Sequence, residues 1–350
     1  MTLHIGLVGC GFIGMVHSVA LRAVIRAGLV DAAVTHTCDI DGERAARMAE
    51  PHGAISGTDL EALVDAVDVV WVCTWTAEHR AVVQAAVDGG RAVFCEKPLA
   101  PTLAECEVVA ALLEQVPHQV GLVLRHAPVF AATADAVASG AYGRPLATSL
   151  RDDQFFPTQG QYASEWRADV AKAGGGTLLE HSIHDVDVLA WILGPPASVR
   201  AETAMRFGHP GIDDVAVLTL GYPDGSHATL LSVWHQILSR SSSRRLEMFC
   251  EDAYLWADDD HLGPLHIETS QGETLVPGEL PTWERQLDVP AEYLAPIVQY
   301  AVPTKAFLDG ITAGGKQGWP DASIALRAHH VVDAAYRSSA AGGVLTPIGP

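Results

Sequence analysis

A glycine-rich segment near the start of the chain constrains the fold more than any other feature of the sequence. An apolar run at residues 3–8 is followed by three glycines spaced as G-x-G-x-x-G, namely Gly9, Gly11 and Gly14. The first glycine permits a tight turn, the second lets a pyrophosphate approach the backbone, and the third lets the following helix, at 14–27, pack close to the strand. A second apolar strand at 32–38 then leads to Asp39, whose carboxylate can accept hydrogen bonds from ribose hydroxyls. The segment therefore predicts a dinucleotide-binding strand–helix–strand unit.

Strand and helix patterns continue to alternate up to about residue 123. Short apolar runs separated by amphipathic helices are typical of a parallel sheet that is covered on both faces. The run at 68–74 ends at Thr74, and Trp75 and His79 follow it. Because ligands bind at the carboxyl ends of parallel strands, we expect these side chains to border the nucleotide.

The pattern changes after this point. From about residue 124 a helical segment is followed by several segments in which apolar and polar residues alternate, and a Pro-Asp-Gly turn at 223–225 indicates a hairpin. The polar run SRSSSRR, at 239–245, is interpreted as a flexible, solvated loop. Antiparallel strands after an α/β half indicate a second, α+β domain. We therefore expect an α/β protein with a nucleotide-binding domain at 1–123 and a domain for substrate binding and oligomerisation at 124–350.

Composition and charge narrow the function. The chain has 350 residues, enough for two domains, and a formal net charge of −20, which disfavours nucleic acid and anionic membranes as partners. No apolar run is long enough to span a bilayer, and we expect no secretory signal. The six cysteines form no C-x-x-C pair, and we interpret them as buried thiols of a cytoplasmic protein.

The first candidate for chemistry is a lysine in the sequence FCEKPLA, at 94–100. Lys97 follows a predicted strand and precedes Pro98, which favours an extended conformation at the edge where the cofactor is expected. A lysine there can bind a substrate hydroxyl, or relay its proton if the lysine pKa is lowered. Glu96 could pair with Lys97 or fix the loop. A plain surface lysine is the alternative that the residues alone leave open.

The second candidate is a patterned helix between Gly174 and Pro196. Glu180, His184 and Asp187 fall at i, i+4 and i+7, so one ligand could contact Glu180 and His184 together. A histidine beside a carboxylate is a natural general acid–base group. A structural helix with a polar stripe is the alternative. No metal site is expected, because the nearby imidazole and carboxylate groups match no H-E-x-x-H motif and no cysteine–histidine cluster completes them.

Taken in order, these segments resemble the Gfo/Idh/MocA oxidoreductase family, named after glucose–fructose oxidoreductase and inositol dehydrogenase. The matching segments, between residue 4 and about 340, are GLVGCGFIGMVH, Asp39, CEKPLA, LRHAPVF with SGAYGRPL, WRADVAKAGGGTLLEHSIHDVDVLAWILG and AFLDGI with ALRAHHVVDAAYRSS. The lysine of the family's E-K-P motif corresponds to Lys97, and the histidine of its helix motif to His184. The chain departs from that motif at Glu180, where the family usually has Asp, and at Ser182, where it usually has Gly.

The resemblance implies an NAD-binding Rossmann domain and a second domain with a large open, mainly antiparallel sheet, through which family members form homodimers or homotetramers. It also implies a dehydrogenase or reductase that interconverts a secondary alcohol and the ketone of a sugar, inositol or related polyol. One alternative is a glycosidase that uses NAD for transient oxidation. Another is a sensor that binds NAD and sugars without catalysis.

Three sets of site residues follow from the motifs and the resemblance. The expected cofactor-binding residues are Gly9, Gly11, Phe12, Ile13, Gly14, Asp39, Thr74, Trp75, His79, Glu96 and Lys97. The expected substrate-binding residues are Lys97, Arg125, Asp153, Trp166, Arg167, Glu180, His184 and Tyr293, with Gln154 as a further candidate. The expected catalytic residues are Lys97, His184 and Glu180.

We expect these residues to act together on one substrate hydroxyl. His184 takes the hydroxyl proton, Lys97 orients the oxygen, and Glu180 binds a neighbouring hydroxyl, although the roles of Lys97 and His184 could be exchanged. The charge of Asp39 would repel a 2′-phosphate, so NAD is expected rather than NADP, even though Arg44 lies close in the sequence.

Overall fold

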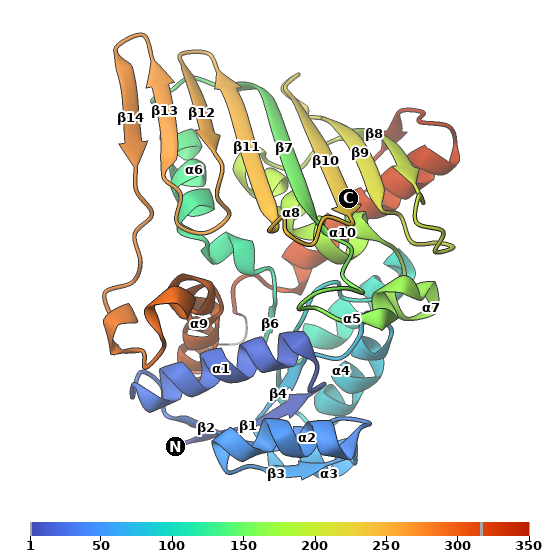
Figure 1. The fold of residues 1–350 in the computed structure, drawn as a ribbon, viewed down its shortest axis with the longest axis vertical. Helices are drawn as coiled ribbons and strands as arrows, with labels where there is room; N and C mark the ends of the chain where they lie inside the picture. The colour runs from blue at the N-terminus through green and yellow to red at the C-terminus, as the bar shows by residue number, and fades with distance from the viewer. Residues whose placement is uncertain (1, 316–317, 350) are drawn as a thin grey trace. The chain divides into compact units, whose positions relative to one another are not determined.

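The computed structural model describes residues 2–315 and 318–349, and these form two compact units (Figure 1). One unit is built from the segments Met1–Val123 and Pro281–Leu326, and the other from Leu124–Leu280 and Arg327–Pro350. The sequence placed all of 124–350 in one domain, whereas here 281–326 groups with the N-terminal segment. The reason is that α9 (Ala291–Thr312) packs against α1 (Phe12–Arg26). The functional roles assigned to the two domains stay a prediction.

The first unit contains a parallel sheet of six strands in the order β3-β2-β1-β4-β5-β6. Its strands are β1 (Leu3–Val8), β2 (Ala32–Cys38), β3 (Ile55–Gly57), β4 (Val69–Val72), β5 (Ala92–Cys95) and β6 (His118–Val120). The parallel sheet predicted from the sequence is confirmed, and only β3, a short strand of exposed residues, was missed. Strand order reverses between β1 and β4, which is the switch point where sheets of this kind bind ligands.

Helices cover both faces of this sheet. They are α1, α2 (Gly42–Ala49), α3 (Leu60–Ala66), α4 (His79–Asp88), α5 (Leu103–Leu113) and α9. Alternate residues of β4 point to opposite faces, so Trp71 packs with Phe94 and with Phe307 of α9, while Val70 and Val72 pack toward α4 and α5. The sequence pattern near the C-terminus indicates helices at 304–313 and 320–339. The first of these predictions was too short, because α9 begins at Ala291 and contains Pro296 and Pro303 within the helix.

The second unit contains a sheet of nine strands in the order β14-β13-β12-β11-β7-β10-β9-β8-β15. The strands are β7 (Pro145–Phe155), β8 (Ser198–Ala204), β9 (Val215–Gly221), β10 (His227–His235), β11 (Ser243–Cys250), β12 (Ala253–Ala257), β13 (Leu265–Thr269), β14 (Gly272–Val276) and β15 (Thr346–Pro347). Only β7 and β10 pair in parallel, as the green strand beside yellow β10 in Figure 1 shows. The large, mainly antiparallel sheet expected from the resemblance is therefore present, and the hairpin of β9 and β10 is confirmed.

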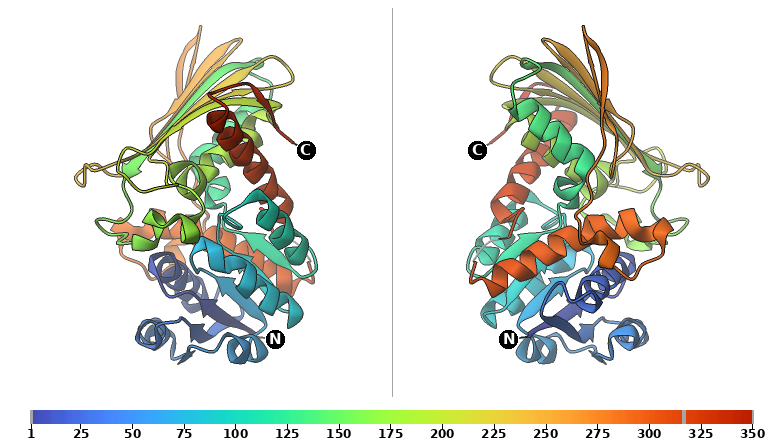
Figure 2. Two further views of the ribbon diagram at one scale, coloured as in Figure 1. Left: turned by 90° about the vertical axis from the view of Figure 1, so that its right-hand side faces the viewer. Right: turned by 90° about the vertical axis from the view of Figure 1, so that its left-hand side faces the viewer.

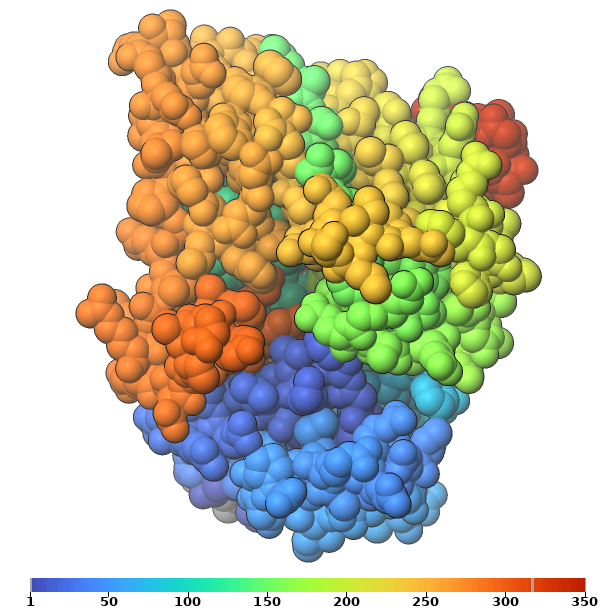
Figure 3. Space-filling model, viewed as in Figure 1, coloured from blue at the N-terminus to red at the C-terminus, as the bar shows by residue number. Residues whose placement is uncertain are grey.

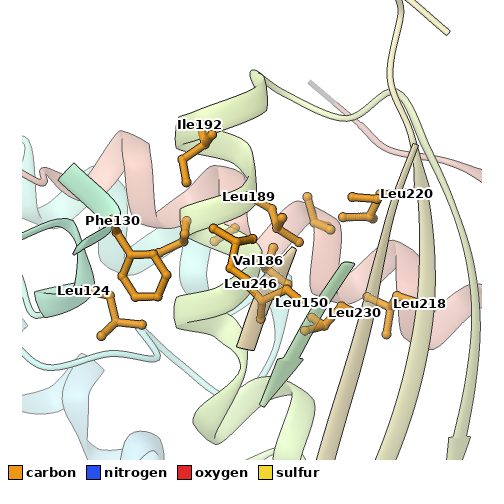
Figure 4. Close-up of a cluster of buried hydrophobic side chains, with 14 of the residues drawn as sticks. Leu124, Phe130, Leu150, Val186, Leu189, Ile192, Leu218, Leu220, Leu230 and Leu246 are labelled. Carbon is orange, nitrogen blue, oxygen red and sulfur yellow. The ribbon is translucent and has the colours of Figure 1, made fainter. Parts of the chain in front are cut away.

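Three helices lie against one face of this sheet, α6 (Pro128–Ala138), α8 (Ile183–Leu193) and the C-terminal part of α10 (Ala322–Ala340) (Figure 2). Figure 4 shows Val186 and Leu189 of α8 toward leucines of the sheet, with Phe130 of α6 on the other side of the helix. No helix from the described part of this unit lies against the opposite face (Figure 2). Within the described residues, no helix combines the length and apolar character that crossing a membrane requires.

Candidate active site

The glycine-rich loop of the first unit contains two glycines that are needed for packing and one that faces open space. Gly9 has a φ of +91°, and a Cβ on it would lie 2.5 Å from the backbone of Cys73 and Thr74. A Cβ on Gly14 would lie 2.2 Å from the Gly9 carbonyl oxygen. A Cβ on Gly11 would meet nothing within 4 Å. The loop is thus held tightly against the end of β4, while the space in front of Gly11 can admit a ligand.

The surroundings of this loop fit a dinucleotide. Gly11 is the N-cap of α1, so the positive end of a 15-residue helix faces that space. The Asp39 carboxylate accepts hydrogen bonds from the backbone nitrogens of Cys10 (2.7 Å) and Asp41 (2.9 Å), which fixes it beside the loop. Thr74 Oγ1, at the end of β4, is buried without a hydrogen-bond partner among the described residues. These groups suit a pyrophosphate, a ribose and a polar group of the cofactor.

The loop that carries Lys97 follows β5, two strands from β1 in the same sheet. Glu96 is buried, its Oε1 lies 2.7 Å from Nε2 of His17, and its Oε2 accepts a hydrogen bond from the Lys97 backbone nitrogen at 3.2 Å. Both carboxylate oxygens of Glu96 therefore hold the loop in place. The predicted contact of Glu96 with the cofactor stays a prediction.

His79 ties this loop to the end of β4. Its Nδ1 lies 2.8 Å from the carbonyl oxygen of Pro98, and its Nε2 lies 3.1 Å from the carbonyl oxygen of Thr74. Carbonyl oxygens only accept hydrogen bonds, so satisfying both contacts requires a proton on each ring nitrogen. Trp75, between these residues, is the N-cap of a short 3₁₀ helix at Thr76–Glu78.

In the second unit, Glu180 and His184 lie on two different kinds of helix. Glu180 belongs to a π-helical turn at Thr177–His181, and His184 to the first turn of α8, with Ser182 between them. The Ser182 nitrogen donates to the Thr177 carbonyl, five residues back, at 2.8 Å. The prediction of one regular helix was therefore wrong at this point. Single π turns often occur at functional sites.

Glu180 lies with two other residues from the predicted substrate set. Its buried carboxylate accepts a hydrogen bond from Arg167 Nε at 3.3 Å, and the Arg167 guanidinium lies 4.4 Å from the centre of the Trp166 ring. His184 is buried one turn further along the chain. The structure thus brings Trp166, Arg167 and Glu180 together around the helix start that carries His184.

Arg125 and Asp153, both predicted to bind substrate, are engaged in ion pairs. Arg125 donates two hydrogen bonds of 2.7 Å to Asp187, and burial raises the pKa of Asp187 despite that guanidinium. Burial also acts to raise the pKa of Asp153, but the hydrogen-bonded Arg240 holds it below its usual value. The substrate roles of Arg125 and Asp153 stay predictions. Tyr293 lies in the first turn of α9, in the first unit, with its side chain exposed.

Sequence reasoning missed several residues that hold the π turn. Asp213 accepts hydrogen bonds from the backbone nitrogens of Gly176 (2.8 Å) and Leu178 (3.1 Å) and from the Tyr336 hydroxyl (2.8 Å). Arg244 is buried on β11, so the predicted loop at 239–245 ends at Ser242 and the prediction was wrong for its last residues. The polar run around Arg244 gives no indication that this side chain is buried. For Asp213, the one sequence feature that indicates a structural role is its position in a pair of aspartates directly before an apolar strand.

A cavity in the second unit has an uncharged lining. The loops around 160 (green) and 239 (gold) lie side by side in Figure 3, and residues from both line a cavity of about 430 Å³. Among the described residues that line this cavity, none is charged. The described residues include no group of three or more His, Cys, Asp or Glu side chains arranged to hold a metal ion.

Comparison with known protein families matches two successive parts of the chain. Residues 3–123 match the oxidoreductase family with an NAD-binding Rossmann fold, and residues 130–256 match the GFO/IDH/MocA C-terminal domain. Among similar proteins, 1,5-anhydro-D-fructose reductase from Ensifer adhaerens is 36% identical over 179 residues, which are 49% of this chain and 53% of that protein. Inositol 2-dehydrogenase 2 from Paenarthrobacter aurescens is 27% identical and is matched over 99% of both chains.

Solved structures show the same fold. Levoglucosan dehydrogenase, in complex with NADH and levoglucosan, superimposes with a TM-score of 0.88 over the full length of both chains, at 20% identity. An oxidoreductase domain protein from Kribbella flavida gives a TM-score of 0.87 at 25% identity, again over the full length of both chains. The two-sheet architecture described above is therefore shared with both of these structures.

Proposed function

Because the chain belongs to the GFO/IDH/MocA oxidoreductase family, with an NAD-binding Rossmann domain, we propose that it interconverts a secondary alcohol and a ketone on a sugar, inositol or related polyol. Relatives named as inositol 2-dehydrogenase and anhydrofructose reductase support this substrate class. The name of levoglucosan dehydrogenase, one of the structures with the same fold, agrees with this substrate class. NAD, when bound, exchanges the hydride with the substrate carbon.

The observation that carries the proposal is the position of Lys97 relative to the glycine-rich loop. Both follow strands of one parallel sheet, whose order reverses between β1 and β4, and β5, which precedes Lys97, pairs with β4. The Lys97 backbone is held by Glu96, and Pro98 by His79. A cation held at this edge suits an oxygen that develops negative charge when its proton leaves.

The catalytic roles remain those proposed from the sequence. In this proposal, Lys97 binds the reacting oxygen and His184 takes its proton. Glu180, which Arg167 fixes in orientation, binds a neighbouring hydroxyl. The reverse assignment of Lys97 and His184 uses the same groups, and a solvent isotope effect on each variant separates the two.

Asp39 favours NAD over NADP in this proposal. Its two oxygens are held by backbone nitrogens, so its charge stays at the end of β2, where a 2′-phosphate would otherwise lie. Arg44, a nearby cation that could attract the 2′-phosphate of NADP, lies 3.7 Å from the carboxylate of Asp41. That pairing weakens its attraction for a phosphate.

Oligomerisation through the open face of the nine-stranded sheet is part of the proposal. Val217 and Leu231 lie opposite each other on β9 and β10 with 47% and 38% of their surfaces exposed, and Phe249 on β11 is 56% exposed. An apolar sheet face of this kind is typical of an interface between copies of a chain. A cytoplasmic location is also proposed, since all six cysteines are buried with free thiols.

The test is the formation of NADH, followed by its absorbance, with a panel of inositols, aldoses, amino sugars and glycosides, repeated with NADP. Lys97→Ala should lower kcat by roughly 10²–10⁴-fold, because a positioned proton-transfer group is lost. Thermal unfolding should stay unchanged, because the Lys97 side chain makes no part of the core. Lys305→Ala, a lysine of the same unit paired with Asp309, is the matched control and should behave as the parent protein.

Four outcomes separate the possibilities. Turnover that disappears in Lys97→Ala identifies the dehydrogenase and its substrate. Turnover near the parent value in that variant removes Lys97 from the mechanism. Release of free sugar from a glycoside without net NADH favours the glycosidase, and tight NAD binding without turnover on any substrate favours the sensor.

A further inference from the structure

A buried charged cluster lies behind the π turn in the second unit. Arg244 on β11 is opposite Asp152 on β7, and its guanidinium donates to Asp185 at 2.7 Å and to Asp260 at 2.7 Å. Asp152 and Asp185 are completely buried, and Arg244 is 5% exposed. One guanidinium therefore faces two carboxyl groups that water does not reach, and an ionised carboxylate is costly in such a place unless it is paired.

The charges within the cluster favour one extra proton. Asp185 Oδ1 accepts from Arg244, and Asp152 Oδ2 accepts from the Ser182 hydroxyl at 2.7 Å. The other two oxygens, Asp152 Oδ1 and Asp185 Oδ2, are buried and have no separate donor in the described part of the chain. Both carboxyl groups lie against the Arg244 guanidinium, with Asp185 Oδ1 2.7 Å from Nε and Asp152 Oδ2 3.5 Å from Nη2. Because Asp260 contacts the same guanidinium, its single charge does not balance all three carboxylates, and a proton on one of the two buried acids lowers the cost of burying them.

His181 does not supply that proton. Its Nε2 lies 3.2 Å from Arg244 Nη2. A guanidinium has no acceptor, so Nε2 accepts and the ring is neutral, with its hydrogen on Nδ1, which lies 3.1 Å from Asp152 Oδ2. The extra proton is therefore assigned to one of the two carboxyl groups.

A chain of hydroxyls connects this acid pair to the π turn. The Ser182 hydroxyl lies 2.7 Å from Asp152 Oδ2 and 2.6 Å from the Ser232 hydroxyl, which in turn lies 2.7 Å from the Thr177 hydroxyl. Thr177 is the first residue of the π turn, and Ser182 immediately follows its last. Ser182 stands where the family usually has glycine, so the chain's own departure from the motif supplies one link.

We propose that Asp152 and Asp185 share a single proton and, together with Arg244 and Ser182, are positioning residues that set the turn carrying Glu180 and His184. Neither acid belongs to the set of residues expected to touch substrate. The shared proton is independent of the proposed function, whereas the positioning role rests on it. The hydroxyl chain and the ion pair fix both ends of a turn that lacks regular α-helical bonding.

The shared proton gives stability a defined dependence on pH. Burial and the neighbouring Asp152, opposed by Arg244, raise the pKa of Asp185 to about 7. The other groups that face the pair are His181 from the π turn and Asp260 with His261 from the loop before β13. An unfolded aspartate has a pKa of about 3.9. The stabilising contribution is therefore complete below about pH 4 and is lost as pH rises through about 7.

The first experiment compares thermal unfolding of the full chain and Asp185→Asn between pH 5 and 8. The asparagine amide can donate to Asp152 and accept from Arg244, so it mimics the protonated acid at every pH. The parent should lose Tm relative to this variant as pH rises, while Asp258→Asn, an exposed aspartate paired with Arg245, should follow the parent. Infrared spectra near pH 6 should show a protonated carboxyl band in the parent that Asp185→Asn removes. Parallel Tm curves together with no such band overturn the shared proton.

The second experiment tests the positioning role. Ser182→Gly, which restores the usual family residue, should lower kcat by roughly tenfold to a hundredfold through misplacement of Glu180 and His184, with NAD affinity unchanged. Ser182→Thr keeps the hydroxyl and should recover part of the loss. Unchanged kcat in Ser182→Gly overturns the positioning role. If the parent itself shows no turnover, the proposed function fails, while the infrared and unfolding measurements still decide the shared proton.

Discussion

Each unit of the molecule opens a helix with a glycine-rich segment, and the two segments are used differently. In the first unit, Gly9 and Gly14 pack against backbone, and the space in front of Gly11 at the start of α1 stays open. In the second unit, a Cβ on Gly176 would lie 1.8 Å from the Asp213 carbonyl oxygen. There the Asp213 carboxylate accepts the backbone hydrogen bonds of the turn.

The difference shows when a glycine-rich helix start becomes a ligand site. Backbone nitrogens at a helix start attract an anion. In the second unit the chain supplies that anion itself, through a buried aspartate, and the backbone there is satisfied. In the first unit a Cβ on Gly11 would meet no atom of the described residues within 4 Å, and we propose that a pyrophosphate binds in this open space. Both segments show closely spaced glycines, so the distinction depends on residues distant in sequence.

The largest expected effect comes from removing the internal anion. Asp213→Ala leaves the buried nitrogens of Gly176 and Leu178 and the Tyr336 hydroxyl without their acceptor, and each such group costs about 1–3 kcal/mol. We therefore expect a loss of about 3–5 kcal/mol in the free energy of unfolding. Denaturant unfolding measures it, and hydrogen exchange should rise within 174–193.

Asp213→Asn is the matched control for this change. Its amide oxygen can still accept one of the backbone hydrogen bonds, so it should recover part of the loss. An Asp213→Ala variant that unfolds like the parent would break the comparison, because the second segment would then not depend on its internal anion.

A smaller effect should distinguish two glycines of the first unit. Gly14→Ala places a methyl group against the Gly9 carbonyl and should cost about 1–3 kcal/mol, as overpacking does. Gly11→Ala meets open space, so it should leave stability unchanged and weaken NAD binding instead. Thermal unfolding and NAD titration of the two variants measure both effects. Equal NAD affinity in Gly11→Ala and the parent would show that the open space is not the pyrophosphate site.

The smallest effect concerns an ordinary helix start on the surface. Thr102 caps α5 by accepting a hydrogen bond from the Glu105 nitrogen at 3.3 Å, and its hydroxyl donates to the Glu105 carboxylate at 2.9 Å. Thr102→Ala should cost about 1 kcal/mol, because water can replace an exposed cap. Thr102→Ser should restore most of it. A loss as large as that of Asp213→Ala would contradict the view that burial makes the internal anion important.

The sequence by itself determined the first unit in most respects. Apolar runs between amphipathic helices identified five of its six strands, and three glycines and an E-K-P segment located the cofactor loop and Lys97. These features are local, because strand period, turn glycines and the residue before a proline act on near neighbours. The family and the use of NAD could also be inferred, since the motifs lie in a recognisable order.

Only the tertiary structure decided how the second unit holds its turn. The π turn at 177–181 and the contact of buried Arg244 with Asp152 and Asp185 leave no periodic pattern, because each depends on partners from separate elements. The first half of α9 was likewise not predicted. Each proline inside it removes one backbone hydrogen bond of the helix, and packing against α1, a segment distant in sequence, stabilises the helix in spite of that. Short-range patterns determine which elements form, whereas burial, which decides whether a charged side chain is paired or solvated, is settled only when distant segments meet.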